Sequence, residues 1–279
     1  MILELKRFKK VVEIGNVTKA SEVLFITQPA LTQSIHRLEK ELGIKLFNQI
    51  GKRIFLSEWG KIVYEQSEKI ISLWEKTKNI KNASDLTSCS IGLFDSAALD
   101  LSKYIQDKLK KTKLEIIIDR SENLLRKLNY GLLDICVCAI PGNYSQFTNI
   151  KLVKSYKEKL IPVSSKVWKE KISEIPFILY SKDSVSQQYV EEAFIRNRIK
   201  PKVVAEAVNP LFIKELTLKS FGVAFLPENM VIEEIKGRKL FIQKFPTQVR
   251  RTCGIFRSKE ELSKETEEIL MEIITEFTI

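Results

Sequence analysis

Near the start of the chain, apolar side chains recur at spacings of three and four residues, which is the period of an amphipathic helix. The pattern predicts one short helix from about Thr18 to Leu24 and a second helix that stops at Gly43. The hydroxyl of Thr27 is suited to cap the second helix, and the fixed φ of Pro29 suits its first turn. The buried side of this second helix is expected to consist of Leu31, Ile35, Leu38 and Leu42. Two short helices joined by a tight turn are typical of a helix-turn-helix.

The opposite side of the second helix is polar and cationic, as a helix that enters the major groove needs to be. Its side chains are those of Gln28, Thr32, Gln33, His36, Arg37 and Lys40. A hairpin is predicted next, with its tip at Gly51, Lys52 and Arg53 and a returning strand over 54–56. A polar helix face alone would favour a small helical bundle with a solvated surface. The cap, proline, apolar stripe, glycine stop and basic hairpin occur in order, which favours a winged helix-turn-helix whose wing reaches phosphate or the minor groove.

Two further helices flank this motif in the predicted order of elements. Residues 2–14 are expected to pack beneath it, and a long amphipathic helix is expected from Glu58 to about Asn82. The long helix exceeds what a small winged domain needs for its own core, so its apolar side predicts pairing with the same helix of a second copy. The alternative is that this side packs on the second domain of its own chain. The polar stretch 82–88 is the predicted hinge.

From Cys89 onwards, short apolar runs alternate with predicted helices, which is the pattern of βαβ units and a parallel sheet. A similar order of elements occurs twice, so two lobes are expected, and Asn149 to Val163 looks like an edge strand that crosses between them. The predicted fold class is α/β overall: a winged helix-turn-helix, a long linker helix, and a two-lobed α/β domain. The predicted boundaries are 1–58 for the winged domain, 59–87 for the linker helix and hinge, and 88–279 for the two lobes. One lobe takes about 88–160 and 245–279, and the other about 161–244.

Charge and composition narrow the class of protein further. The net charge is +11 over 279 residues, and residues 1–61 alone carry eleven Lys and Arg against six Glu, a net +5. Charge density is therefore highest in the predicted DNA-binding segment. No run of eighteen apolar residues appears, and the first helix has charges within its apolar part, unlike a signal peptide. A cytoplasmic protein with no membrane partner is expected, which argues against a transport solute-binding protein. A non-specific architectural DNA binder would not need the two-lobed domain.

The residues that carry chemistry are few. The four cysteines, Cys89, Cys136, Cys138 and Cys253, have neither zinc-ligand spacing nor the pattern of a disulfide framework. Buried structural thiols are favoured over a redox switch, because no flanking charge indicates a lowered pKa. The single histidine lies on the predicted DNA-facing helix, which excludes a Ser-His-Asp or Cys-His arrangement in the two lobes. The sequence thus predicts a protein that is not an enzyme, without catalytic residues, metal ligands or cofactor.

Several segments together resemble one known family. NVTKASEVLFITQPALTQSIHRLEKELGIKLF, followed by GKRIFLSEWG, is similar to the DNA-binding domain of LysR-type transcriptional regulators. The later segments SIGLF, LLRKLNYGLLDICV and LTLKSFGVAFLPENMV occur in the order that this family uses. The resemblance implies a linker helix that forms a homodimer, often with tetramers assembled as dimers of dimers. It also implies an effector-binding domain similar to type 2 periplasmic binding proteins, with a small ligand between two lobes.

The resemblance assigns DNA-binding roles to particular residues of this chain. Thr27, Gln28, Pro29 and Thr32 match the positions that meet DNA at the start of the recognition helix, with Arg37 further along and Lys52 and Arg53 in the wing. The family often carries arginine where this chain has Gln33, His36, Asn48 and Gln49. Fewer arginines mean fewer phosphate and guanine contacts. Because glutamine pairs with adenine, Gln28 and Gln33 favour an A·T-leaning half-site in an inverted-repeat operator of double-stranded DNA.

The candidate effector-binding residues follow predicted strands, because ligands of such folds bind where strand C-termini meet helix N-termini. The first lobe offers Asp95, Ser96, Arg120, Ser121 and Glu122; the second offers Ser181, Lys182, Ser184, Val208 and Asn209. The free N–H groups at the helix starts and the cations of Arg120 and Lys182 favour an anionic effector, whereas Asp95 favours an amine-bearing one. Plain helix capping is the alternative role of Ser96 and Asn209. A regulator controlled by a protein partner or by redox state, with no small-molecule ligand, is the alternative function.

Overall fold

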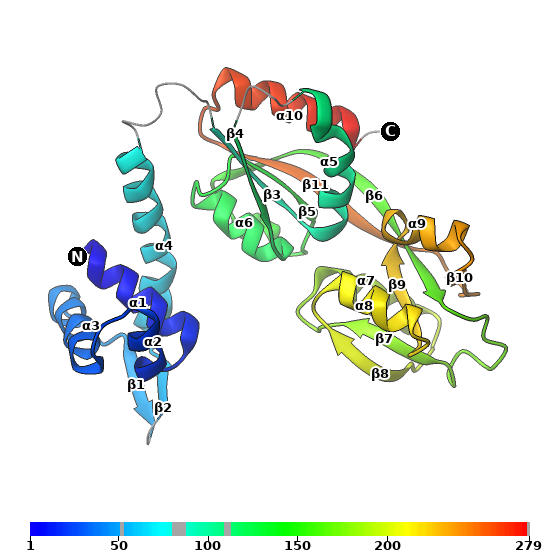
Figure 1. Ribbon diagram of the computed structural model, residues 1–279, viewed down its shortest axis with the longest axis horizontal. Helices are drawn as coiled ribbons and strands as arrows, with labels where there is room; N and C mark the ends of the chain where they lie inside the picture. The colour runs from blue at the N-terminus through cyan, green and yellow to red at the C-terminus, as the bar shows by residue number, and fades with distance from the viewer. Residues whose placement is uncertain (51–52, 80–87, 109–112, 278–279) are drawn as a thin grey trace. The chain divides into compact units, whose positions relative to one another are not determined.

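The computed structural model describes residues 1–50, 53–79, 88–108 and 113–277, and it forms two compact units (Figure 1). The first unit consists of Met1–Asp85 with Tyr130–Leu132, and the second consists of Leu86–Asn129 and Leu133–Ile279. The mixture of a helical N-terminal unit and a large α/β unit confirms the predicted fold class. Among the described residues, no helix is both long enough and apolar enough to cross a membrane. The predicted hinge at 82–88 lies almost wholly outside the described residues.

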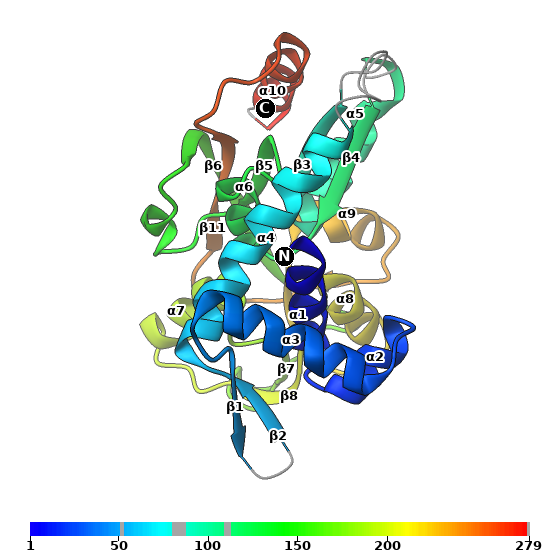
Figure 2. The same cartoon turned by 90° about the vertical axis from the view of Figure 1, so that its left-hand side faces the viewer.

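The first unit is a winged helix-turn-helix (Figure 2). Its elements are α1 (Ile2–Ile14), α2 (Val17–Val23), α3 (Gln28–Leu42), β1 (Phe47–Ile50), β2 (Arg53–Leu56) and α4 (Glu58–Asn79). Strands β1 and β2 pair antiparallel, with Ile50 opposite Arg53, so the predicted wing is present. The core is formed by side chains of all three short helices and of the approach to β1. Its fully or nearly buried members are Leu5, Phe8, Val11, Ala20, Leu31, Ile35, Leu38 and Leu46.

The predicted ends of α3 are confirmed by its caps. The hydroxyl of Thr27 accepts a hydrogen bond from the Ala30 backbone N–H at 3.4 Å, and Pro29 lies in the first turn. Gly43 follows the helix with φ of +69°, a left-handed conformation that glycine adopts without strain. One detail of the predicted stripe is wrong: Leu42 is 39% exposed, because it lies in the last turn, beyond the side chains that α1 covers.

The start of α4 packs closely on the segment that leads into the wing. The Ser57 backbone N–H donates to the carbonyl of Leu46 at 2.9 Å, and the Ser57 hydroxyl donates to the carbonyl of Lys45 at 2.6 Å. Gly60 lies at the same contact, where an added Cβ would come within 2.1 Å of the Leu46 carbonyl oxygen. Only glycine permits this approach. The wing and α4 are thereby fixed to each other through Leu46.

The second unit is built on one sheet with strand order β4-β3-β5-β11-β6-β9-β7-β8, and β10 pairs with β6. The strands of the first lobe are β3 (Ser88–Leu93), β4 (Lys113–Ile118) and β5 (Ile135–Ala139), and those of the second are β7 (Pro176–Tyr180), β8 (Lys202–Ala207), β9 (Val223–Pro227) and β10 (Phe241–Ile242). Two long strands, β6 (Ile150–Ser164) and β11 (Val249–Ser258), pair antiparallel and pass between the lobes (Figure 1). The prediction that this segment is an edge strand that crosses between the lobes is confirmed by the register. Among the described residues, 150–159 of β6 pair with β11 alone, and only 160–164 pair with the second-lobe strands β9 and β10.

Helices cover the sheet in both lobes. The first lobe carries α5 (Asp95–Lys108), α6 (Ser121–Asn129) and α10 (Lys264–Glu276), and the second carries α7 (Val185–Arg196), α8 (Pro210–Leu218) and α9 (Glu228–Lys236). A short 3₁₀ turn, Tyr144–Gln146, precedes β6. Each of α5 to α8 begins directly or within a few residues after a parallel strand, as βαβ connections require. The helix starts are therefore gathered at the carboxyl ends of β3, β4, β7 and β8.

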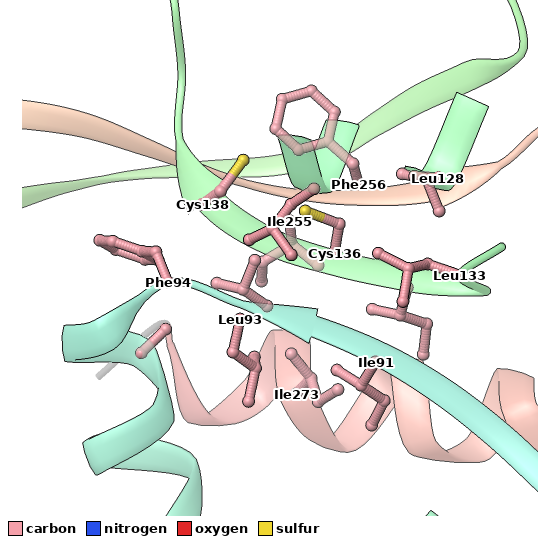
Figure 3. Packing of buried hydrophobic residues seen from close by; sticks show 14 of the residues in the cluster. Ile91, Leu93, Phe94, Leu128, Leu133, Cys136, Cys138, Ile255, Phe256 and Ile273 are labelled. Atoms are coloured by element: carbon pink, nitrogen blue, oxygen red, sulfur yellow. The ribbon is translucent and has the colours of Figure 1, made fainter. Parts of the chain in front are cut away.

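The core of the first lobe is apolar and fully buried (Figure 3). Ile91 and Leu93 of β3 pack against β5, β11 and Ile273 of α10, and the thiols of Cys136 and Cys138 lie within the same cluster. The second lobe has an aromatic core with edge-to-face ring pairs at centroid distances of 4.9 to 5.8 Å. These rings belong to Phe177, Phe194, Phe225 and Phe245. Both lobes are thus rigid supports for what lies between them.

Candidate functional site

The outer face of α3 presents the polar residues that the sequence predicts. The side chains of Thr27, Gln28, Pro29, Gln33, His36 and Arg37 are exposed, and that of Thr32 is half-buried. Positions 28, 32 and 36 form one row along the helix, and positions 29, 33 and 37 form the next. Within the first row, the Gln28 amide donates to the Thr32 hydroxyl at 3.1 Å. Lys52 and the side chain of Arg53 lie outside the described residues, although Arg53 begins β2.

Glu39, on the inner side of α3, ties the recognition helix to the wing, a role that sequence reasoning missed. Its carboxylate accepts the Leu46 backbone N–H at 2.8 Å and the Lys45 ammonium at 2.9 Å, and Nδ1 of His36 lies 3.2 Å from it. Burial alone would raise the pKa of Glu39, but these hydrogen bonds outweigh burial and lower it. The contact to Leu46 sets where β1 begins relative to α3.

The second unit contains a pocket of about 210 Å³ at the junction of its lobes. The pocket lies at the carboxyl ends of parallel strands from both lobes, where α5, α6, α7 and α8 begin. Eight of the ten predicted effector residues line it: Asp95, Ser96, Arg120, Ser121, Glu122, Ser181, Ser184 and Val208. The neighbours Asp183 and Pro210 line it as well. The fold therefore brings together segments that are far apart in the sequence, such as Ser96 and Arg251 at a separation of 155 residues.

Two predicted residues, Lys182 and Asn209, are not among the lining residues. Lys182 is exposed, and its neighbours on both sides face the pocket instead. The Asn209 side chain is used as the cap of α8, where its oxygen accepts the backbone N–H groups of Leu211 at 2.8 Å and Phe212 at 3.1 Å. This is the capping role that the sequence left open for Asn209. Neither residue enters the site described below.

Arg251 on β11 is the central charged group of the pocket, and no sequence pattern indicated it. The residue is only 4% exposed. Its Nε donates to the Glu158 carboxylate of β6 at 2.6 Å, and its terminal nitrogens donate to the hydroxyls of Ser96, at 2.8 Å, and of Ser186. Burial alone would lower the pKa of Arg251, but Glu158 outweighs burial and raises it. Ser96 lies in the first turn of α5 in the first lobe, and Ser186 lies in the first turn of α7 in the second, so one guanidinium joins the two lobes.

Two other contacts cross between the lobes. Arg120 of the first lobe forms an ion pair with Asp183 of the second, and both residues line the pocket. On α9, the Asn229 amide donates to the Ser96 carbonyl at 3.0 Å and to the Asp100 carboxylate at 2.7 Å. A change in lobe spacing would break these polar contacts.

The four cysteine thiols are buried within the second unit. Burial raises the pKa of Cys89 to about 12, and it also raises the pKa of Cys138 and of Cys253. Since the thiolate is the reactive form, none of these three thiols is activated for redox chemistry. This geometry gives no support to redox control.

Treatment of the native protein with iodoacetamide at pH 8 is therefore expected to alkylate the cysteines at least tenfold more slowly than free cysteine, and all four should react in 6 M guanidinium chloride. Mass spectrometry of the labelled protein gives the number of alkylated cysteines. Rapid labelling of one cysteine in the native protein would identify an accessible thiol and would support control by redox state.

A winged helix-turn-helix with a polar recognition face, joined in one chain to a two-lobed α/β unit, defines a DNA-binding transcriptional regulator. Comparison with known proteins gives the family. Residues 2–61 match the family model described as a bacterial regulatory helix-turn-helix protein of the lysR family, and residues 100–278 match the LysR substrate binding domain. The chain therefore belongs to the family of LysR-type transcriptional regulators.

Individual relatives agree with this assignment. The chain is 26% identical over 273 residues to the HTH-type transcriptional activator CmpR of a Synechocystis species. This alignment covers 92% of this chain and 89% of the relative. Two solved structures share the fold. HypT from Salmonella typhimurium, a hypochlorite-specific LysR-type regulator, has a TM-score of 0.61 at 18% identity and covers 100% and 99% of the two chains. DarR from Vibrio fischeri, solved in complex with DNA, has a TM-score of 0.59 at 22% identity and covers 98% of each chain.

Proposed function

We propose that this regulator binds an inverted-repeat operator as a homodimer or a dimer of dimers, and that a small-molecule effector in the lobe pocket controls it. The observation that carries the proposal is Arg251, which joins the starts of α5 and α7 across a pocket lined by both lobes. A ligand that inserts there changes the spacing of the lobes. It acts as an effector if it binds one arrangement of the protein better than the other.

The proposed DNA-binding surface is the outer face of α3 together with the wing. We assign base-edge contacts to the exposed side chains of Gln28, Gln33 and His36. The role of positioning the helix on the duplex is assigned to Thr27, Pro29, Thr32 and Arg37. Lys52 and Arg53 of the wing are assigned to phosphate from the sequence alone. DarR, which shares this fold, was solved in complex with DNA, which supports a DNA-binding role for the proposed surface.

Gln28→Ala is expected to relax base preference, and Arg53→Ala to weaken binding to all sequences alike. Loss of a bidentate glutamine–adenine pair removes about 1–3 kcal/mol of discrimination, while loss of one phosphate contact lowers the salt slope by about one. Fluorescence anisotropy with operator and random duplexes over a salt series measures both. If the two substitutions lowered binding to both duplexes equally, the assignment of base recognition to Gln28 would be wrong.

Dimer formation is assigned to α4. Large apolar side chains remain exposed along this helix within the first unit: Trp59, Ile62, Ile70, Leu73 and Trp74. A long helix with a spare apolar stripe is stabilised by pairing with its own copy. We assign residues 1–58 to DNA binding, 59–87 to dimerisation, and 88–279 to effector binding.

Effector control is tested on the full chain with a metabolite panel. Each compound is added to the protein, and affinity for operator DNA is measured by anisotropy alongside the melting temperature. One chemical class is expected to raise the melting temperature saturably and to change operator affinity severalfold. If operator binding were unchanged by every compound while the protein remained folded, control by a protein partner would replace control by a small molecule.

A further inference from the structure

The balance of charge in the lobe pocket distinguishes between an anionic and a cationic ligand. Four carboxylates and two guanidinium groups belong to the described residues that line it. Arg120 forms an ion pair with Asp183, and Arg251 forms an ion pair with Glu158. Asp119 is paired with Lys127 at 2.6 Å. Within the described part of the chain, these pairs leave the carboxylates of Asp95 and Glu122 without a cationic partner, whereas both lining cations are neutralised.

Asp95 is the deeper of these two carboxylates. It is the first residue of α5, and in the described residues its carboxylate has no hydrogen-bond partner except its own backbone N–H. Burial raises the pKa of Asp95, against a smaller opposite effect of the Arg251 charge. A carboxylate that is desolvated without a counter-ion costs folding free energy. Such a group is retained at low cost only where something else neutralises it.

Tyr180 supplies an independent indication that a polar ligand group belongs beside Asp95. Its side chain lines the pocket and is 5% exposed, yet its hydroxyl has no hydrogen-bond partner. Tyr180 ends β7, Asp95 begins α5, and both residues line the same pocket together with Arg251. The neighbouring Ser181 hydroxyl is also buried without a partner. Buried polar groups normally have a hydrogen-bond partner. We therefore expect a ligand to supply a donor or an acceptor to the hydroxyls of Tyr180 and Ser181.

An anionic ligand is disfavoured by the same geometry. To reach Arg251, an anion would have to displace the Ser96 and Ser186 hydroxyls from a guanidinium that already uses all three of its nitrogens. It would then share the pocket with the Asp95 carboxylate. To reach Arg120, it would have to replace Asp183. A cation meets neither obstacle, because Asp95 is open to the pocket and carries the opposite charge.

We propose that the effector carries a protonated amino group that forms an ion pair with Asp95 and donates a hydrogen bond to the Tyr180 hydroxyl. The inference rests on the proposed function of the pocket as the effector site, and it specifies the ligand class. The pocket, at about 210 Å³, is smaller than the roughly 300–1,000 Å³ of most drug-sized sites. The effector is therefore a small amine rather than a nucleotide or a large aromatic compound.

The test uses the full chain and four compounds that share a four-carbon skeleton: putrescine, 4-aminobutanoate, 1,4-butanediol and succinate. Melting temperature is recorded against the concentration of each compound. A saturable rise is expected with one or both of the amines, and none with the diol or succinate. In Asp95→Asn the rise disappears. In Tyr180→Phe the apparent dissociation constant increases about three- to tenfold, the effect of one hydrogen bond. Glu233→Gln, an exposed carboxylate on α9 outside the pocket, is the charge-matched control and retains the wild-type response.

A second measurement needs no ligand. Without any compound, Asp95→Asn is expected to raise the melting temperature at pH 7.5, because it removes a half-buried charge that has no cationic partner among the described residues. The gain should shrink as pH falls toward the raised pKa of Asp95, since the wild-type carboxyl then becomes neutral too. A lower melting temperature in Asp95→Asn would show that the carboxylate already has a structural partner, and would overturn the inference.

The two proposals fail in different ways. A saturable rise with succinate that persists in Asp95→Asn would overturn the amine inference and leave small-molecule control standing. If neither these four compounds nor the wider metabolite panel altered melting temperature or operator affinity, small-molecule control itself would fall, and the amine inference with it.

Discussion

Glu158→Gln is expected to destabilise the second unit by about 3–5 kcal/mol, because it leaves the Arg251 guanidinium buried without its counter-charge. The two side chains are 13% and 5% exposed and are joined by a 2.6 Å ion pair. The remaining contacts of Arg251 are to the neutral hydroxyls of Ser96 and Ser186, which do not replace the lost charge. This substitution has the largest expected effect on stability because the Glu158 carboxylate is the one counter-charge that forms an ion pair with the buried Arg251 among the described residues.

The measurement needs a probe that reports only the second unit. Trp168 is the one tryptophan of this unit, since the chain has three and the others are Trp59 and Trp74. Urea unfolding is therefore followed by fluorescence in a Trp59→Phe, Trp74→Phe background, and the shift in midpoint is converted with the unchanged m-value.

A matched control lies next along the same strand. Lys159 and Glu228 form an ion pair at 3.3 Å, but their side chains are 48% and 42% exposed. Glu228→Gln should therefore change the free energy of unfolding by less than about 1 kcal/mol. Equal, small effects of Glu158→Gln and Glu228→Gln would mean that Arg251 is compensated by some other group.

Removing both charges separates stability from signalling. In a Glu158→Leu, Arg251→Met double variant, the unfolding free energy is expected to return close to the wild-type value, because apolar residues of similar volume replace a desolvated pair at little cost. The guanidinium that joins Ser96 to Ser186 is nevertheless lost. If that bridge couples the lobes, the double variant is stable and binds operator DNA, yet its affinity no longer changes with effector.

The first unit was predictable because its signals are local. Thr27, Pro29 and Gly43 act through backbone conformation within one helix, and the apolar stripe of α3 repeats within four turns. Such features depend on near neighbours in the sequence, so they can be predicted without knowledge of the tertiary structure. The same holds for the eight predicted pocket residues, which follow strands at helix starts. Lys182 and Asn209 fail because proximity to a helix start does not fix the direction of a side chain.

The long-range features were not predictable. Arg251 lies 155 residues from Ser96 and 93 from Glu158, and no spacing rule relates them. Strand β6 was predictable because its signal is local. Its residues alternate between exposed and half-buried over 150–159, where the strand pairs with β11 alone among the described residues.

In the first unit, Glu39→Gln is expected to destabilise the winged helix-turn-helix by about 2 kcal/mol at pH 7, the scale of hydrogen bonds to a charged group. The buried carboxylate holds the Leu46 backbone N–H and the Lys45 ammonium, and an amide loses the charge that strengthens both contacts. Because Leu46 leads into β1, the substitution should also loosen the wing relative to α3 and reduce affinity for all DNA sequences.

The effect of Glu39→Gln depends on pH in a defined direction. The pKa of Glu39 is lowered in the folded protein, so its carboxylate contributes stability that is fully present above the ordinary value of 4.5. That contribution is lost as pH falls through the lowered pKa, because the native carboxylate must then take up a proton. The difference between wild type and Glu39→Gln should accordingly be constant from pH 7 to about pH 5 and shrink below pH 4.

Urea unfolding followed by Trp59 fluorescence, in a Trp74→Phe, Trp168→Phe background, measures this difference at each pH. Glu13→Gln is the control, because Glu13 pairs with Lys10 on the surface of the same unit with both side chains more than a third exposed. Its effect should stay below about 1 kcal/mol at every pH. A Glu39→Gln difference that grew in acid would mean that burial, rather than hydrogen bonding, dominates the pKa of Glu39. The ionised carboxylate would then destabilise the fold, and the link from α3 to the wing would have to lie in other contacts.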